Sequence, residues 1–191
     1  MGVTVVTPPT WPLVPVEELK SHLNIDFDDD NALLELYLET ISEQIDGPSG
    51  DLNRAVSPQV LLLTVDCFPR DGIELPYPPC TSVDWVKYTD PLGVEQTLST
   101  DVYETATEGK YTWVRRQFEQ EWPEVRRHPG SVSIQFQCGP ATLSKRDRQA
   151  IYLMGGDLYE NRASQVIDQG RAVLIANPTV DRLLKRDPIV K

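Results

Sequence analysis

The chain has 191 residues, of which 40% are hydrophobic and 25% are charged. This composition is typical of a folded globular protein and excludes a chain that is disordered throughout. The net charge of -11 disfavours a general nucleic-acid binder, because neutralising phosphates requires clustered lysine and arginine side chains. The N-terminus lacks a signal-peptide pattern and no 18 apolar residues run together, so we expect neither a signal peptide nor a membrane span.

The first third of the chain predicts an extended arm followed by two helices. Residues 1–14 are rich in proline, threonine and valine, which favours an extended arm. Pro15 suits a helix start, and the acidic residues that follow it suit a helix N-terminus, so a short helix is expected up to about Leu23. A longer amphipathic helix is expected from about Asp30 to Ile45, because its apolar residues recur every three or four positions. The acidic segment before it offers several capping side chains.

Residues 58–140 change to short β-prone runs separated by turn residues, which predicts an antiparallel β region. A turn is expected at 90–93, where proline and glycine suit the turn dihedral angles. The expected strands are 60–68, 73–75, 82–88, 94–98, 111–116 and 131–137.

Helical character returns at Ser144, which can cap a helix that runs to about Asn161. Gly155 and Gly156 lie inside this helix, and either allow a close approach by another helix or mark a weak point. A last helical turn with Thr179 as its cap is expected in the C-terminal tail. Its leucines have little core of their own, so they are expected to bury against another part or another chain.

The predicted fold class is therefore α+β: a small helical bundle with an inserted antiparallel β lobe and an extended C-terminal tail. The helices before and after the β region need one another to bury their apolar faces. The expected boundaries are 1–14 for the arm, 15–57 with 141–165 for the bundle, 58–140 for the β lobe and 166–191 for the tail.

The sequence contains no pattern that predicts catalysis, a metal or a cofactor. His22 and His128 stand outside any metal-binding or catalytic motif, and no phosphate-binding or nucleophile motif occurs. The acidic segment places Asp26, Asp28 and Asp30 at calcium-loop spacing. The loop then lacks glycine at its turn and glutamate at its end, which favours a helix cap over an EF-hand.

The cysteines and the aromatic residues also bear on function. Three cysteines lie far apart without a CxxC pair, which argues against a disulfide framework or a zinc site and fits a reduced intracellular setting. The aromatic residues of the β region are expected in its core, although some could form a platform for stacking sugars or bases. They are Trp85, Tyr88, Tyr103, Tyr111, Trp113 and Trp122.

Acidic residues are concentrated between Val16 and Asp51, where Lys20 is the only cation, and cations gather after Arg115. This asymmetry suits subunits that meet acidic face to basic face, or it simply marks a solvated surface. Both interpretations stay open on the sequence alone.

An ordered set of segments resembles the phage head-tail connector family, which includes gp6-like and gp8-like adaptors of long-tailed phages and gene transfer agents. The segments are 16–23 (VEELKSHL), 28–34 (DDDNALL), 67–76 (CFPRDGIELP), 79–93 (PCTSVDWVKYTDPLG), 131–139 (SVSIQFQCG), 157–162 (DLYENR) and 180–184 (VDRLL).

The resemblance implies a structural, non-enzymatic virion protein that is made in the host cytoplasm and resides in the neck. Such a subunit forms a homo-oligomeric ring, commonly a dodecamer, between the portal protein and a stopper or tail-completion protein, and DNA passes through the lumen without sequence-specific binding. Another neck or tail-terminator role is the alternative, followed by a carbohydrate-binding or hydrolytic β module.

Two groups of candidate contact residues follow. For portal docking the tail offers Val180, Arg182, Leu183, Leu184, Lys185 and Arg186, since leucines can supply burial and cations orientation. For the subunit interface the candidates are Glu35, Glu39, Glu43, Arg146, Arg148, Tyr159 and Arg162.

Overall fold

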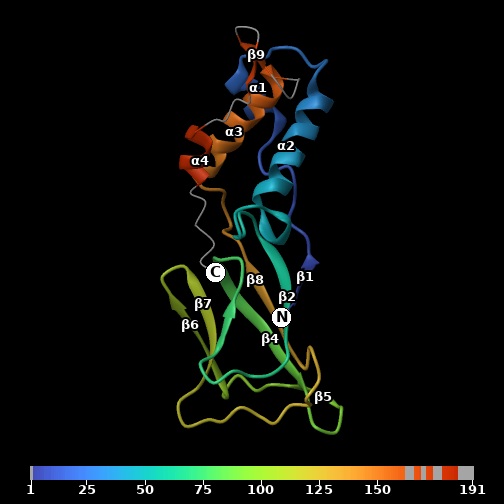
Figure 1. Cartoon of the computed structure of the whole chain (residues 1–191), viewed down its shortest axis with the longest axis vertical. Coiled ribbons are helices and arrows are strands. Elements are labelled where there is room, and N and C mark those ends of the chain that lie inside the picture. Colours follow the sequence, from blue (N-terminus) through green and yellow to red (C-terminus); the bar gives the residue numbers. More distant parts are fainter. Residues whose placement is uncertain (1, 162–165, 169–170, 174–177, 185–191) are drawn as a thin grey trace. The chain divides into compact units, whose positions relative to one another are not determined.

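The computed structural model describes residues 2–161, 166–168, 171–173 and 178–184. The chain divides into two compact units. A β unit contains residues 1–9 and 53–141, and a helical unit contains residues 10–52 and 142–191. The predicted α+β class is confirmed, with helices and antiparallel sheets (Figure 1).

The helical unit is built on α1 (Val16–Leu23), α2 (Asn31–Ile45) and α3 (Lys145–Glu160). Gly47–Ser49 forms a short 3-10 helix after α2. Ser144 caps α3 as predicted, because its Oγ accepts a hydrogen bond of 3.1 Å from the Asp147 N–H. The buried side chains of these elements form an apolar interior, and they are Leu19, Leu34, Leu38, Ile41, Ile45, Ala150 and Ile151.

The glycine pair of α3 allows α1 to approach closely. A Cβ atom on Gly155 would lie 2.9 Å from both Cδ atoms of Leu19, and one on Gly156 would lie 3.2 Å from a Cδ of Leu23. Leu19 is fully buried. Of the two explanations that the sequence left open, close helix packing is the one that the contacts support.

The described part of the tail contains three short elements. The strands β9 (Val166–Asp168) and β10 (Arg171–Val173) pair antiparallel, and α4 (Pro178–Leu184) follows. Thr179, which the sequence suggests as the cap, lies inside this helix, and Pro178 occupies its first position. The rest of the predicted tail lies outside the described residues.

The β unit has a five-stranded antiparallel sheet in the order β1-β2-β8-β4-β5. Its strands are β1 (Gly2–Thr7), β2 (Gln59–Val65), β8 (Val132–Cys138), β4 (Cys80–Thr89) and β5 (Glu95–Thr97). A second, three-stranded sheet has the order β3-β7-β6, with β3 (Ile73–Leu75), β7 (Tyr111–Arg116) and β6 (Tyr103–Glu108).

One apolar cluster joins the two sheets. Along β8, Val132, Ile134, Phe136 and Cys138 are buried while the residues between them are more exposed, as expected for a strand with one inward face. The cluster also takes Leu61 and Leu63 from β2 and Val114 from β7, among others. The β unit therefore has a core of its own.

Two segments differ from expectation. Residues 2–7, expected in a free arm, form β1 and pair with β2 from Gly2↔Thr64 to Thr7↔Val60. Tyr103–Glu108, for which no strand is expected, forms β6 and pairs with β7 along its whole length. Both are edge strands in their sheets, where outward side chains can stay polar or exposed.

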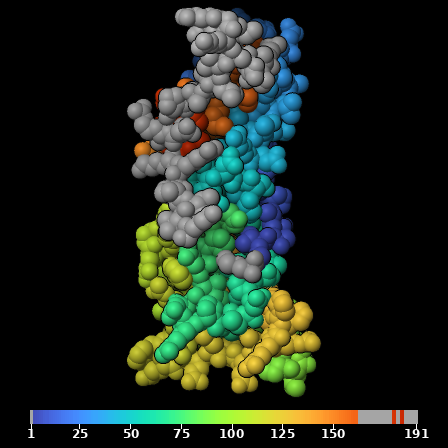
Figure 2. Space-filling view, viewed as in Figure 1, coloured from blue at the N-terminus to red at the C-terminus, as the bar shows by residue number. Residues whose placement is uncertain are grey.

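At one end of the β unit, the turn at 90–93 lies beside the segment 124–127, as the green and yellow-orange surfaces show (Figure 2). The Arg126 N–H donates a 2.9 Å hydrogen bond to the carbonyl of Thr89. Pro91 and residues 124–127 line a shallow hollow there. No helix within the described ranges is long and apolar enough to cross a lipid bilayer.

Candidate functional site

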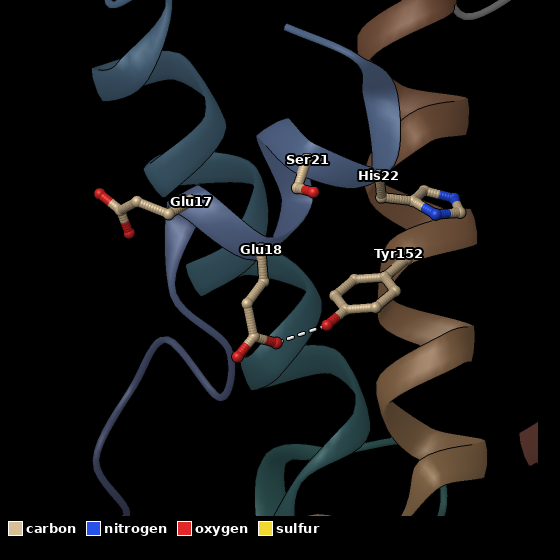
Figure 3. Close-up of a pocket in the computed structure, with 5 residues that line it drawn as sticks. All are labelled: Glu17, Glu18, Ser21, His22 and Tyr152. Carbon is tan, nitrogen blue, oxygen red and sulfur yellow. Dashed lines mark hydrogen bonds between the residues drawn. The ribbon is translucent and has the colours of Figure 1, made fainter. Parts of the chain in front are cut away.

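Glu18, Arg148 and Tyr152 form a polar cluster that ties α1 to α3, here named the α1–α3 cluster. The Arg148 Nη1 lies 2.9 and 2.7 Å from the two carboxylate oxygens of Glu18. The Tyr152 hydroxyl donates a hydrogen bond to the same carboxylate (Figure 3). A charged acceptor strengthens both contacts. The cluster therefore joins two helices that are about 130 residues apart in the sequence.

The α1–α3 cluster borders a shallow hollow that is also lined by Glu17, Ser21 and His22 (Figure 3). His22 stacks on Tyr152 with ring centroids 5.2 Å apart. Ser21 and His22 are neighbours on one helix, so their side chains diverge, and no hydrogen bond joins them among the described contacts. The hollow holds serine, histidine and glutamate without the geometry of a catalytic triad.

The contacts within the α1–α3 cluster raise the pKa values of Tyr152 and Arg148. Burial raises the pKa of Tyr152, and its hydrogen bond to the Glu18 carboxylate raises it further. The hydrogen bond with Tyr152 and the charge of Glu18 raise the pKa of Arg148. The tyrosine thus stays neutral and the arginine charged at neutral pH, which suits a structural clasp better than proton transfer.

The exposed side of α2 carries Glu35, Glu39 and Glu43 at four-residue spacing, and we call these three the acidic face. None of them forms an ion pair within the described residues. Leu36 lies beside them with 56% of its surface exposed. Because residues three and four apart share one side of a helix, this surface is both acidic and partly apolar.

Of the basic candidates for the subunit interface, Arg146 is exposed near the start of α3. Arg148 instead belongs to the α1–α3 cluster, and the Tyr159 hydroxyl donates a 2.7 Å hydrogen bond to Asp30. Arg162 lies outside the described residues. In the structure, Arg148 and Tyr159 therefore form hydrogen bonds within their own chain, whereas the acidic face and Arg146 are exposed on the surface.

Glu18 and Asp30 were not singled out from the sequence as partners of these residues. Asp30 precedes α2, but its side chain makes no capping hydrogen bond there and accepts from Tyr159 instead. Asp28 is engaged by Lys20, whose Nζ lies 2.6 Å from its carboxylate, and this contact lowers the pKa of Asp28. The capping role expected for this acidic segment is therefore replaced largely by contacts between elements.

The last helix buries part of its apolar side within the chain. Val180 and Leu184 are 9% and 7% exposed, and α4 lies against α3. The expectation that the leucines of this helix bury against another part is met by Leu184, for which α3 supplies the apolar surface. Leu183 is partly exposed. The side chain of Arg182, and the whole of Lys185 and Arg186, lie outside the described part of the chain.

The aromatic residues of the β unit divide into two groups. Tyr103 is buried, and Tyr88 and Trp122 pack against the core, where Trp122 stacks on Phe68 at 4.6 Å between centroids. The predicted core role is confirmed for these three.

The remaining aromatic rings each lie beneath a cation. Lys87 lies 4.9 Å from the ring centroid of Trp85. Lys110 and Arg115 lie 5.0 and 5.4 Å from those of Tyr111 and Trp113. Cations over these rings leave less bare surface for a stacked sugar or base.

Within the described residues, no group of three or more histidine, cysteine, aspartate or glutamate side chains is arranged to hold a metal ion. The described polar clusters join helices of one chain or lie open on a helix surface. The comparisons with known proteins bear on what this arrangement serves.

Residues 14–87 match the family model described as phage gp6-like head-tail connector protein. This match spans α1, α2, β2, β3 and most of β4, and it agrees with the family resemblance that the sequence shows. The comparison with curated proteins finds no match.

Three similar solved structures come from gene transfer agent (GTA) particles. A chain of the structure described as the virion of a native GTA particle has 23% identity and a TM-score of 0.75. Chains from the neck of an empty particle, computed with C6 symmetry, and of a native particle, computed with C12 symmetry, both have 21% identity and TM-scores of 0.70 and 0.66. Each match covers 97% of this chain and 94% of the other. At this identity the likeness shows a shared fold over nearly the whole chain.

Proposed function

We propose that the protein is a structural head-tail connector subunit that forms a homo-oligomeric ring in the neck of a tailed virion. The observation that carries this proposal is the agreement of two comparisons. The family match covers the first helices and part of the β unit, and the fold match to GTA particle chains covers nearly all of the rest. C6 and C12 symmetry in the related neck structures supports a ring of repeated subunits.

A closed ring of one kind of subunit needs two different surfaces that fit one another. The acidic face of α2 is one such surface, and Leu36 adds exposed apolar area to it. Arg146, exposed near the start of α3, offers the opposite charge. We assign these residues to the contact between neighbouring subunits. Arg148 and Tyr159 act indirectly, because they hold α3 against α1 and the start of α2 in the same chain.

The portal protein on one side and a stopper or tail-completion protein on the other are the partners of this ring. For portal docking we assign Arg182, Leu183 and the residues from Lys185 onward. Val180 and Leu184 are buried in the helical unit, so they support the segment instead of inserting into the portal. The contact then depends on the cations and on the residues after 184.

The ring acts as a conduit without enzymatic activity, and DNA passes through it. The net charge of -11 supports this role, because an acidic ring repels the phosphate backbone and does not hold the DNA. The hollow beside the α1–α3 cluster offers no nucleophile and base in hydrogen-bond contact.

Mixing the purified protein with its cognate portal protein tests the connector role. Native mass spectrometry and negative-stain microscopy should show rings of the subunit on the portal. Reversing the charge of the acidic face with Glu35→Lys and Glu39→Lys should abolish ring formation and leave the circular dichroism spectrum of the monomer unchanged. A matched control is Glu95→Lys in the β unit. Monomers that never associate with the portal would contradict the connector role, and rings formed by the charge-reversed variant would contradict only the assigned interface.

The docking segment is tested separately from the ring. Removal of residues 185–191, or Arg182→Ala combined with Lys185→Ala and Arg186→Ala, should weaken portal binding at least tenfold while ring formation persists. These changes spare Val180 and Leu184, so the packing of α4 on α3 is retained. Undiminished portal binding by both variants would contradict the assignment, and would favour a neck or tail-terminator subunit without portal contact.

A further inference from the structure

Cys80 and Cys138 lie directly opposite one another on neighbouring strands. They are partners in the register of β4 and β8, and their pair is the one at the end of this ladder, next to Pro79 and Gly139. Cys138 is buried in the core cluster of the β unit, and Cys80 is partly buried and packs against the same cluster. Both side chains therefore point to the same side of the sheet. Neither forms a disulfide in the structure, and their thiols donate hydrogen bonds to the carbonyls of Ser82 (from Cys80) and Gln59 (from Cys138).

A backbone hydrogen bond identifies the kind of pair that they form. The N–H of Gly139 donates to the carbonyl of Pro79 at 2.9 Å. In an antiparallel ladder, a bond between the residues that flank a pair marks that pair as non-hydrogen-bonded, the kind whose Cα atoms approach to about 4.5 Å. Disulfides span Cα distances of about 4.4–6.8 Å. The strands are therefore close on the Gly139 side of the pair, although the register shifts between Cys80 and Ser82 on the other side. To bond, the two sulfur atoms must leave the carbonyls of Ser82 and Gln59 and turn toward one another.

We infer that Cys80 and Cys138 are a redox modification site that closes to a cross-strand disulfide. With a peroxide as oxidant, the Cys80 thiolate attacks one peroxide oxygen, the O–O bond breaks, and a Cys80 sulfenic acid and hydroxide form. The Cys138 thiol then attacks the Cys80 sulfur, the S–S bond forms, and the sulfenic oxygen leaves with the Cys138 proton and a second proton as water. Two thiols are oxidised and one peroxide is reduced to two waters.

The surroundings of the pair set the order and the speed of these steps. Cys80 is partly exposed and reacts first, whereas Cys138 is 1% exposed and acts as the resolving thiol. Burial raises the pKa of Cys80 to about 11, so little thiolate is present at neutral pH. Closure is therefore slow and not a rapid signalling response. Cys67 is exposed and has no partner cysteine, which makes it the internal control.

The stage at which the two thiols would meet an oxidant is inferred from the proposed function. A virion protein is made in a reducing cytoplasm, where both thiols stay reduced, and later meets oxidising surroundings in the released particle. Cys138 lies three residues before Ala141, where the chain leaves the β unit. A bond to Cys80 would fasten this exit to the neighbouring strand β4, after assembly and not before it.

The experiment uses the full chain with Cys67→Ser, which keeps the pair intact and removes the exposed thiol. The protein is treated with hydrogen peroxide, digested without reduction and analysed by mass spectrometry. We expect a peptide linked through Cys80 and Cys138, loss of both titratable thiols in the monomer, and a rise of roughly 10 °C in the melting midpoint of the β unit that dithiothreitol reverses.

Cys67→Ser combined with Cys80→Ser is the matched control, and it should show neither the linked peptide nor the thermal shift. Sulfinic acid at Cys80 with an unmodified Cys138, or two persistent thiols after prolonged oxidation, would overturn the inference. The assay needs neither the ring nor the portal protein. A negative result here therefore leaves the connector role standing, and a failure of ring assembly leaves the disulfide testable.

Discussion

The β unit and the helical unit are held together in different ways. In the β unit, one apolar cluster joins residues of both sheets, and its strands pair in continuous ladders. In the helical unit, a smaller set of buried leucines and isoleucines is supplemented by polar contacts between distant elements. The α1–α3 cluster and the bond of Tyr159 to Asp30 are examples.

This difference indicates how strongly the stability of each unit depends on the residues at its surface. A unit with a large apolar interior keeps its fold when outer residues change. A unit whose helices are fastened by partly exposed polar contacts is more sensitive to changes at its surface, although each such contact contributes little by itself. The following substitutions test whether the two units respond separately and by the amounts that their interiors predict.

The largest effect is expected from Phe136→Ala in the centre of the β unit. Phe136 is fully buried on β8, so removing its ring should cost about 3–5 kcal/mol in the free energy of unfolding. Hydrogen exchange should show lost protection in the strands and nearly unchanged protection in α2 and α3. Equal loss in both units would mean that they unfold as one body, and the comparison between them would fail.

In the helical unit, Leu38→Ala should cost about 2–5 kcal/mol, because Leu38 is fully buried on α2. Leu36→Ala is the matched control on the same helix, since Leu36 is 56% exposed, and it should stay within about 0.5 kcal/mol. Chemical denaturation followed by circular dichroism at the helical wavelengths measures both. Similar costs for the two variants would mean that the buried face of α2 is assigned wrongly.

Gly155→Ala should destabilise the helical unit by about 1 kcal/mol. Alanine improves helix propensity by about 1 kcal/mol, but its methyl group would meet buried Leu19 at 2.9 Å, and overpacking costs about 1–3 kcal/mol. Gly156→Ala is the control, because its Cβ meets Leu23 at 3.2 Å and Leu23 is only half-buried. We expect Gly156→Ala to be neutral or stabilising in thermal melts. A stabilising effect of Gly155→Ala would show that α1 can shift away from α3 at little cost in free energy.

The smallest effect is expected from Tyr152→Phe, and it depends on pH. The pKa of Tyr152 is raised on folding, so the folded state holds the phenol proton more tightly than the unfolded state. This contribution is present below pH about 10 and is lost as the pH rises through the folded pKa. The wild type should therefore lose stability in alkali more steeply than Tyr152→Phe, while at neutral pH the variant costs no more than about 1 kcal/mol. Parallel pH profiles of the two melting midpoints would contradict this role.

Much of the fold follows from local patterns in the sequence. The strands 73–75 and 111–116 have the predicted bounds, and α2 begins and ends within a residue of its expected limits. These segments carry clear apolar periodicity. No strand was predicted for Tyr103–Glu108 because most of its residues are glutamate and threonine. It becomes a strand only through its ladder with β7. Gly2–Thr7 was expected as an arm because its partner lies more than 50 residues away.

The candidate site was less accessible from the sequence. Glu35, Glu39 and Glu43 were named from the sequence as interface candidates, and they lie exposed on α2. The partners of Arg148 and Tyr159 were not, since Glu18 and Asp30 lie about 130 residues away and many acidic residues compete for the same roles. The burial of Val180 and Leu184 likewise depends on the placement of α4 on α3, which no local pattern of seven residues determines.

The division of the chain has a mechanical consequence. Because β1 precedes the first helical segment, the backbone passes from one unit to the other at three places, near residues 9, 52 and 141. A pull applied between the two units is therefore divided among three covalent connections, and a single proteolytic cut leaves them tethered. In the proposed connector role, such redundancy would spread the load that packaged DNA on one side and a tail on the other place on each subunit.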